Sequence, residues 1–243
     1  MSEGAIEVVR ILGVLGVLGS FTIMVTDWIG WTRPLSSAGK RHDMSTVDHW
    51  FRGFPEDRGH GISHLRRYWA SVIGGLAMLP CGLGFVTIYL GLIPAGHGWA
   101  LLTAGCLGGI MVFGTFAHTM CGIVDDLSDT REETAVGSAE RARVDAFYAK
   151  LLAYMAAFMP GLVVLQVLGS MLFSYFVFTG QTVFPAWVGL INHFILSQLC
   201  MATKRFAPLS VWRWIAPPHM HLLTSLPLLI AGSYYTWNGV ALY

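Results

Sequence analysis

The sequence predicts an all-α fold, a polytopic membrane helix bundle that forms a single integral membrane domain over residues 1–243. Three observations predict it: a low charge content, long apolar runs and a one-sided distribution of basic residues. Only 12% of the residues are charged, against about 25% in a typical soluble domain. Hydrophobic residues make up 54% of the chain, and the mean hydropathy is +0.58. The net charge of +1 gives no basic excess, so a nucleic acid partner is not expected.

Six segments have the length and apolar character of a membrane-spanning helix. Such a helix needs about 20 predominantly apolar residues. The segments are 8–31, 68–94, 98–122, 147–179, 183–203 and 219–241. A further apolar stretch, 207–218, is too short to span, and it is interpreted as an interfacial helix or loop. If it did cross the membrane, the bundle would have seven helices.

The basic residues predict which way the helices run. Of the 15 Lys and Arg residues, 14 fall on one side of a six-helix arrangement, and only Arg10 falls on the other. Loops rich in Lys and Arg stay cytoplasmic. We therefore predict that loop 32–67 and the charged loop 123–146 are cytoplasmic, and that both termini lie on the opposite side. The N-terminal stretch lacks the basic region of a cleavable signal peptide, so the first segment is predicted to remain in the protein.

Ionisable groups inside predicted spans indicate a functional site, because burying them in a bilayer is costly. Asp27 lies near the cytoplasmic end of the first segment, and His118 lies at a similar depth in the third. Asp125 follows seven residues after His118, on the same helical face two turns away. We predict that Asp27 is a general acid and that His118, oriented by Asp125, is a base or an orienting group.

Further polar and aromatic residues are predicted to line a substrate site with these three. Arg66 and Arg67 are the expected partners of Asp27. The predicted substrate-binding residues are Arg66, Arg67, Trp69, Asn192, His193 and His219.

Each of these groups also has a purely structural interpretation. Asp27 could lie at the headgroup level beside Trp28 and anchor its helix. His118 could hold two helices together by a hydrogen bond. His219 could be interfacial, and Asp125 could simply end its helix.

Metal and cofactor chemistry is not predicted. The four cysteines form no CxxC pair, and HExxH is absent. The histidine pairs HGISH (60–64) and HMH (219–221) leave a metal- or haem-dependent oxidoreductase open as an alternative.

Two resemblances arise from these residues. The Gly-rich first segment ending in Thr26-Asp27-Trp28, the entry Arg66-Arg67-Tyr68-Trp69 and the FAH sequence at His118 resemble an uncharacterised family of small prokaryotic polytopic membrane proteins. Size and architecture also resemble the small membrane-integral terpene cyclases of meroterpenoid pathways. That second resemblance implies a prenylated substrate in the bilayer, a carboxylic acid that protonates it, and aromatic residues that stabilise a carbocation.

These observations lead to a functional hypothesis with two classes of alternative. The leading hypothesis is an intramembrane enzyme that acts on a lipophilic isoprenoid or meroterpenoid substrate by acid-initiated cyclisation or isomerisation, as a terpene cyclase, isomerase or lyase of secondary metabolite biosynthesis. The expected partners are that substrate and the lipid bilayer. The first alternative to this enzyme is a small-molecule transporter or a non-catalytic membrane partner. The second is the metal- or haem-dependent oxidoreductase named above.

Overall fold

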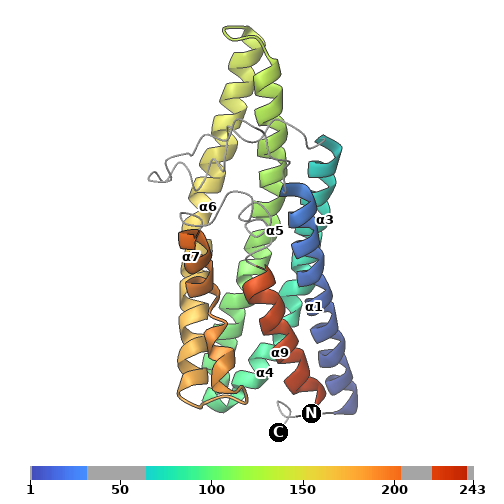
Figure 1. The fold of residues 1–243 in the computed structure, drawn as a ribbon, viewed down its shortest axis with the longest axis vertical. Helices are drawn as coiled ribbons and strands as arrows, with labels where there is room; N and C mark the ends of the chain where they lie inside the picture. Colours follow the sequence, from blue (N-terminus) through green and yellow to red (C-terminus); the bar gives the residue numbers. More distant parts are fainter. Residues whose placement is uncertain (1, 32–63, 204–220, 240–243) are drawn as a thin grey trace.

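Helices make up almost all of the described chain. The computed structural model describes residues 2–31, 64–203 and 221–239, and within these ranges it contains helices and short turns but no strand (Figure 1). The described part thus confirms the all-α prediction. Loop 32–67 lies outside the described residues up to position 63.

Four helical stretches are long and apolar enough to cross a membrane: Glu3–Ile29, Tyr68–Ala95, His97–Val124 and Ala139–Phe178. They correspond to the first four predicted segments. Much of their apolar surface faces outward, as shown by Leu18, Leu76, Leu101 and Val164, each more than half exposed. Apolar patches of this extent are rare on soluble monomers, so contact with lipid explains them.

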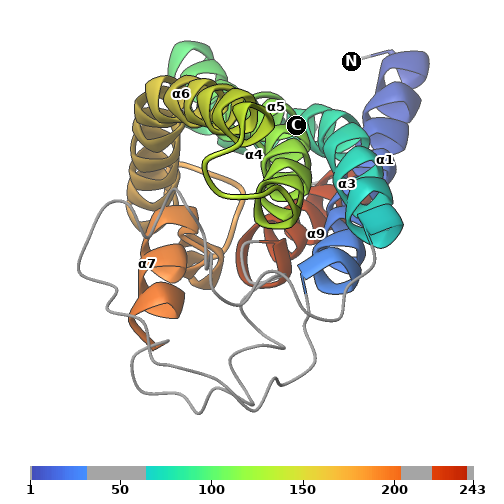
Figure 2. The same cartoon turned by 90° about the horizontal axis from the view of Figure 1, so that it is seen from above.

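The long helices stand side by side in an arc. α1 (Glu3–Trp31), α3 (His64–Gly84), α5 (His97–Glu133) and α6 (Ala139–Phe178) follow one another around it, and α9 lies on the concave side (Figure 2). After α3 the chain turns at Phe85 into α4 (Val86–Leu92) and the 3-10 turn η2 (Ile93–Ala95). The second predicted segment is therefore two helices with different directions.

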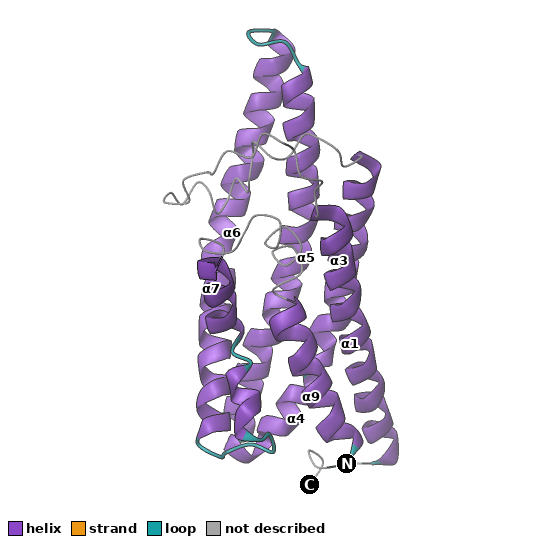
Figure 3. Cartoon of the chain, viewed as in Figure 1, coloured by secondary structure: helices purple, strands orange, loops and turns teal. Residues whose placement is uncertain are grey.

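α5 and α6 form a helical hairpin that projects beyond the ends of α1 and α3 (Figure 3). The charged segment 123–146, expected as a helical or coil connection, is mostly helical, because only residues 134–138 separate the two helices. Gly137 adopts a φ of 84° in this turn, which favours glycine. Ser138 then caps α6 by accepting a hydrogen bond from the Arg141 backbone N–H at 3.0 Å. Asp145 accepts hydrogen bonds from Arg131 and Arg141, so the charged residues stabilise the hairpin.

Of the last two predicted spans, 183–203 is interrupted, whereas the described part of 219–241 is helical without a break. Segment 183–203 contains the 3-10 helix η3 (Ala186–Leu190), a break, and α7 (His193–Thr203). In segment 219–241, a π-helical turn η4 (His221–Ser225) leads into α9 (Leu226–Trp237). The 11 described residues of α7 cover about 16 Å, and η3 and the break precede them. The prediction of one continuous helix in segment 183–203 is wrong.

Small residues let α1 and α3 approach closely. A Cβ atom added to Gly16 would lie 2.5 Å from the Cα atom of Gly84, which is backbone and cannot rotate away. We predict that Gly16→Ala lowers the free energy of unfolding by about 1–3 kcal/mol. The matched control is Gly105→Ala, where an added Cβ meets nothing within 4 Å. That change should be neutral or stabilising, because alanine favours a helix over glycine. Unfolding monitored by circular dichroism in detergent would compare them, and equal effects would contradict this packing.

Candidate functional site

A carboxylate and an imidazole meet inside the helix bundle. Asp27 on α1 and His118 on α5 are 91 positions apart in sequence, yet Asp27 Oδ1 and His118 Nε2 lie 2.7 Å apart. The side chains of His118 and Asp27 are only 9% and 11% exposed. The structure therefore brings together two of the three predicted catalytic residues.

The second ring nitrogen of His118 shows how many protons the pair holds. Nδ1 lies 3.1 Å from the backbone carbonyl oxygen of Ser71 on α3. A carbonyl oxygen can only accept, so Nδ1 carries a hydrogen and donates it. The 2.7 Å contact on the other side of the ring then needs one further proton, on Nε2 or on the carboxyl group. Both arrangements are neutral overall, which limits the cost of burying the pair.

A glycine on α3 makes the contact possible. α3 lies between α1 and α5, so the imidazole must cross its surface to reach Asp27. A Cβ atom added to Gly74 would lie 2.5 Å from His118 Cε1 and 2.7 Å from Thr26 Oγ1. A missing side chain at position 74 therefore provides the space for the ring, and the Ser71 carbonyl one turn earlier orients it.

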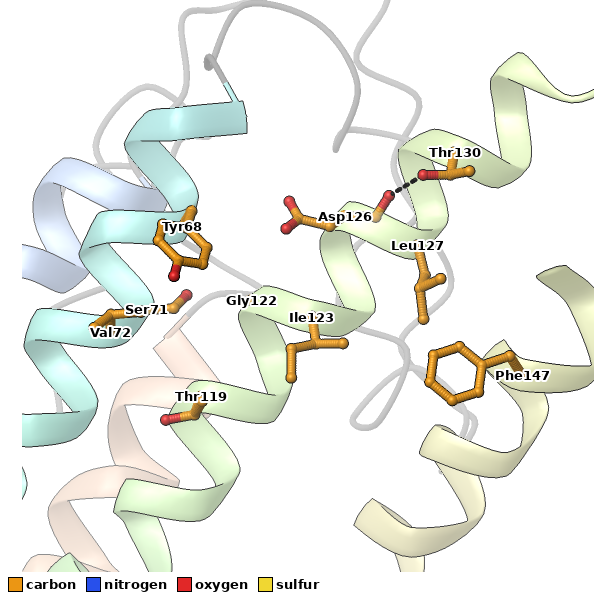
Figure 4. Close-up of a pocket in the computed structure, with 10 residues that line it drawn as sticks. All are labelled: Tyr68, Ser71, Val72, Thr119, Gly122, Ile123, Asp126, Leu127, Thr130 and Phe147. Atoms are coloured by element: carbon orange, nitrogen blue, oxygen red, sulfur yellow. Dashed lines mark hydrogen bonds between the residues drawn. The ribbon is translucent and has the colours of Figure 1, made fainter.

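A cavity of about 470 Å³ lies beside the pair, between α3, α5 and α6. Figure 4 shows its walls. Ser71 contributes to both the pair and the cavity. Its backbone carbonyl oxygen accepts the hydrogen bond of His118, and the residue lines the cavity. The Ser71 hydroxyl is buried and has no hydrogen-bond partner within the described part of the chain. The lining residues are Tyr68, Ser71, Val72, Thr119, Gly122, Ile123, Asp126, Leu127, Thr130 and Phe147.

Asn192 and His193 belong to a different polar group, where α6 meets α7. Asn192 Nδ2 donates to the Ser170 carbonyl at 3.0 Å and to Ser174 Oγ at 2.8 Å, and its Oδ1 accepts from the Ile195 backbone N–H at 2.8 Å. Asn192 thus caps α7. Its amide hydrogen bonds go to α6 and to the start of α7, so they do not support the prediction that Asn192 lines a site with Asp27 and His118.

His193 is the first residue of α7 rather than the middle of a longer helix. Its Nδ1 lies 3.1 Å from Gln166 Nε2 and its Nε2 lies 3.3 Å from Ser225 Oγ. Because the Gln166 amide donates, Nδ1 accepts and the ring carries its hydrogen on Nε2. His193 therefore links α6 to η4 as a neutral, buried hydrogen-bonding group, 2% exposed.

The remaining predicted residues fall into two groups, those outside the described part of the chain and Trp69. The side chains of Arg66, Arg67 and Asp125, and the whole of His219, lie outside the described residues. Both ring nitrogens of His118 have other partners, so the Ser71 carbonyl has the orienting role that was predicted for Asp125. Trp69 is 51% exposed and packs edge-on against its neighbour Tyr68, which lines the cavity in its place. In residues 2–31, 64–203 and 221–239, no three His, Cys, Asp or Glu side chains form a group that could hold a metal ion.

Sequence reasoning missed three residues that organise the two polar groups. Ser71 and Gly74 look like ordinary packing residues on a Gly-rich helix, and no local pattern distinguishes them. Gln166 did carry a signal, since it is a polar residue in the middle of the apolar run 161–178, and such residues are rare in spans and face the bundle interior.

Comparison with protein families gives a match over residues 1–230. No curated protein and no solved structure matches the chain. The family match covers nearly the whole chain, including the pair, the cavity and the break before α7. The chain belongs to the family of unknown function DUF6796.

Proposed function

We propose that this protein is an integral membrane enzyme that protonates a lipophilic substrate within the bilayer. In the proposed arrangement six segments cross, the fifth as the two pieces η3 and α7, the basic loops are cytoplasmic and both termini lie on the other side. The α5–α6 hairpin then projects into the cytoplasm, and the Asp27–His118 pair lies in the cytoplasmic half of the bundle. Support comes from the direction of the helices: Asp27 is near the end of α1 that approaches the hairpin.

The proposed reaction is acid-initiated cyclisation or isomerisation of an isoprenoid or meroterpenoid substrate. The observation that carries the proposal is the 2.7 Å contact between Asp27 and His118, which requires one shared proton and is buried within the helix bundle. The pair donates this proton to an olefin or epoxide of the substrate and becomes anionic. Loss of a proton from the resulting carbocation returns it to the pair, so the protein is unchanged after each turnover. General acid catalysis of this kind contributes about 10²–10⁴-fold in rate.

The cavity supports the same proposal as a place for the substrate. It shares Ser71 with the pair, and apolar side chains such as Val72 and Ile123 form much of its wall. Tyr68 and Phe147 add aromatic rings, whose faces attract positive charge. An apolar cavity with a few polar groups is the usual form of a small-molecule site.

Asp27→Asn tests the proposal because the amide can still donate a hydrogen bond to His118 Nε2 but has no proton to transfer. Purified protein in lipid nanodiscs would be incubated with prenylated and epoxidised polyenes, and products would be measured by mass spectrometry. We expect Asp27→Asn to lower turnover by at least about 100-fold with the fold intact. Glu3→Gln, a carboxyl-to-amide change at the exposed start of α1, should retain turnover. Equal turnover of Asp27→Asn and the wild type would remove Asp27 from the mechanism.

A specific observation favours a second candidate function, a small-molecule transporter. Interrupted helices near mid-bilayer often hold the binding sites of transporters, and the break before α7 is lined by Asn192 and His193. This function predicts substrate flux into proteoliposomes without chemical conversion. It also predicts that Asn192→Ala abolishes flux, whereas the enzyme proposal predicts product formation by the wild type.

A further inference from the structure

Exposed tryptophan and tyrosine side chains gather at two levels along the helix bundle. At the end where α5 begins and α9 ends, they are Trp99, Tyr175, Tyr234 and Trp237. Toward the α5–α6 hairpin, they are Trp28, Tyr68, Trp69 and Tyr154. These residue types are enriched at both interfaces of a membrane protein. The two groups therefore indicate where the headgroup layers of a bilayer contact the chain.

The separation of the two levels matches a bilayer. Gly122 of α5 packs against Ser71 of α3, one turn from Tyr68, so the level on the hairpin side crosses α5 near Gly122. From Trp99 to Gly122, α5 rises about 35 Å. The hydrocarbon core of a bilayer is about 30 Å thick, and the bilayer with its headgroups about 40–45 Å. The part of α5 beyond Gly122 thus lies in and above one headgroup layer.

The cavity between α3, α5 and α6 lies at this level. Its lining follows α5 from Thr119 to Thr130, a rise of about 16 Å (Figure 4). Tyr68, Ile123 and Phe147 in its wall are exposed. The cavity is therefore a groove that opens to its surroundings at the edge of the hydrocarbon core.

The apolar wall of the groove continues into the lipid-facing surface of the bundle. Leu76 follows Val72 by one turn on α3, and Phe116 precedes Ile123 by two turns on α5, so each pair shares a helical face. Leu76 and Phe116 are both exposed. A molecule that lies along these two side chains in the hydrocarbon core can therefore extend into the groove without leaving an apolar surface.

A lipid chain suits this position better than water does. In a headgroup layer, apolar side chains such as Leu127 and Phe147 of the groove stay in contact with water unless something covers them, and burial of apolar surface is favourable. An acyl chain reaches this wall directly from the hydrocarbon core. The depth and the apolar continuity of the groove therefore favour a bilayer lipid as its occupant.

We propose that the groove takes a lipid sideways from the leaflet on the hairpin side. The acyl chain of this lipid lies along Leu76 and Phe116, and its upper carbons and glycerol lie between Tyr68, Ile123 and Phe147. The inference goes beyond the proposed function, because it holds whether or not the chain is an enzyme. Only one consequence rests on that function: a lipophilic substrate enters by the same opening and displaces the lipid.

A photoreactive phospholipid tests the proposal. The protein would be placed in nanodiscs of phosphatidylcholine that contain an analogue with a diazirine on an upper acyl carbon, and mass spectrometry would identify the labelled residues. Tyr154 is the matched reference, since it is exposed on α6. It lies at the same level as the groove, because Leu151 and Met155 beside it pack with Met120 and Val124 of α5.

We expect Ile123 and Phe147 to be labelled about fivefold more strongly than Tyr154, which corresponds to a preference of about 1 kcal/mol. Equal labelling of the three residues would show lipid that merely surrounds the protein, and it would overturn the proposal. Labelling of Tyr154 without labelling of the groove would also overturn it, because another part of the chain or a second copy then covers the groove.

Filling the groove should abolish the preference. Ile123→Trp places a large ring there, so labelling of Phe147 should fall to that of Tyr154. The control Val164→Trp adds the same ring at an exposed position of α6 outside the groove, and its groove should be labelled like that of the wild type. If Ile123→Trp does not fold, Phe147→Ala removes part of the wall at an exposed position and should lower the labelling of Ile123. Unchanged labelling of Ile123 in that variant would contradict the assignment.

Asp27→Asn separates this inference from the proposed function. Its groove should be labelled like that of the wild type, because Asp27 does not line it. Selective labelling together with full turnover in Asp27→Asn would refute the acid mechanism and leave the lipid groove standing. Uniform labelling together with loss of turnover in Asp27→Asn would do the reverse.

Discussion

His118→Ala is expected to lower the free energy of unfolding by about 3–5 kcal/mol, the range for breaking a buried ion pair by removing one partner. The change leaves Asp27 buried on α1 without the imidazole that now contacts it at 2.7 Å, and it removes the link to the Ser71 carbonyl. Because the ring joins α1, α3 and α5, its loss weakens the packing of three helices at once. Chemical or thermal unfolding in nanodiscs would measure the effect.

His97→Ala is the matched control for this prediction. His97 is exposed, and its Nδ1 contacts Tyr89 Oη at 3.0 Å, so the same substitution there should cost less than about 1 kcal/mol. Asp27→Asn should be much milder than His118→Ala, because the asparagine amide can replace the bond to Nε2. Similar losses for His118→Ala and His97→Ala would mean that the pair contributes little to stability.

Gly74→Ala should produce the second large effect, because the added Cβ would occupy the position of the His118 ring, 2.5 Å from Cε1. The ring must move, and overpacking alone costs about 1–3 kcal/mol. Displacement of the ring also breaks the contact with Asp27, so we expect a loss of stability and of turnover together. Unfolding and product formation would be measured on the same preparation.

A double variant shows whether the ring is the cause. In a His118→Ala background the space beside position 74 is empty, so Gly74→Ala should cost much less than it does in the wild type. Substitutions of residues in contact are non-additive in this way. If Gly74→Ala costs the same in both backgrounds, its effect comes from another contact, such as Thr26.

The first four spans and the described part of the last were predictable from sequence because length and hydropathy determine them, whereas the break in segment 183–203 was not. Segment 183–203 has the composition of a spanning helix, but Asn192 places its side chain on the Ile195 backbone N–H and starts a new helix there. Whether an asparagine caps a helix or points into a bundle depends on what faces it, and Ser170 and Ser174 of α6 supply the partners. Such tertiary contacts leave no pattern in the local sequence.

The sequence predicted that the site residues lie at one depth along their helices, but it did not predict which residues contact each other. The direction of each helix placed Asp27 and His118 at one level, and the structure joins them. Their partners were a different matter. Sequence spacing suggested Asp125 for His118, yet Ser71 and Gly74 on α3 determine the orientation and position of the ring. These residues act through a carbonyl group and through a missing side chain, and neither has a residue-specific signature.

The most direct test of the central claim, a single proton shared between Asp27 and His118, is the ¹⁵N spectrum of histidine-labelled protein in lipid. Solid-state NMR distinguishes protonated from unprotonated ring nitrogens, and the His118→Gln spectrum assigns the signals. We predict a protonated Nδ1 and an Nε2 signal shifted by a strong hydrogen bond, which Asp27→Asn converts to that of an unprotonated acceptor nitrogen. A His118 signal that Asp27→Asn leaves unchanged would contradict the shared proton, and with it the proposed acid.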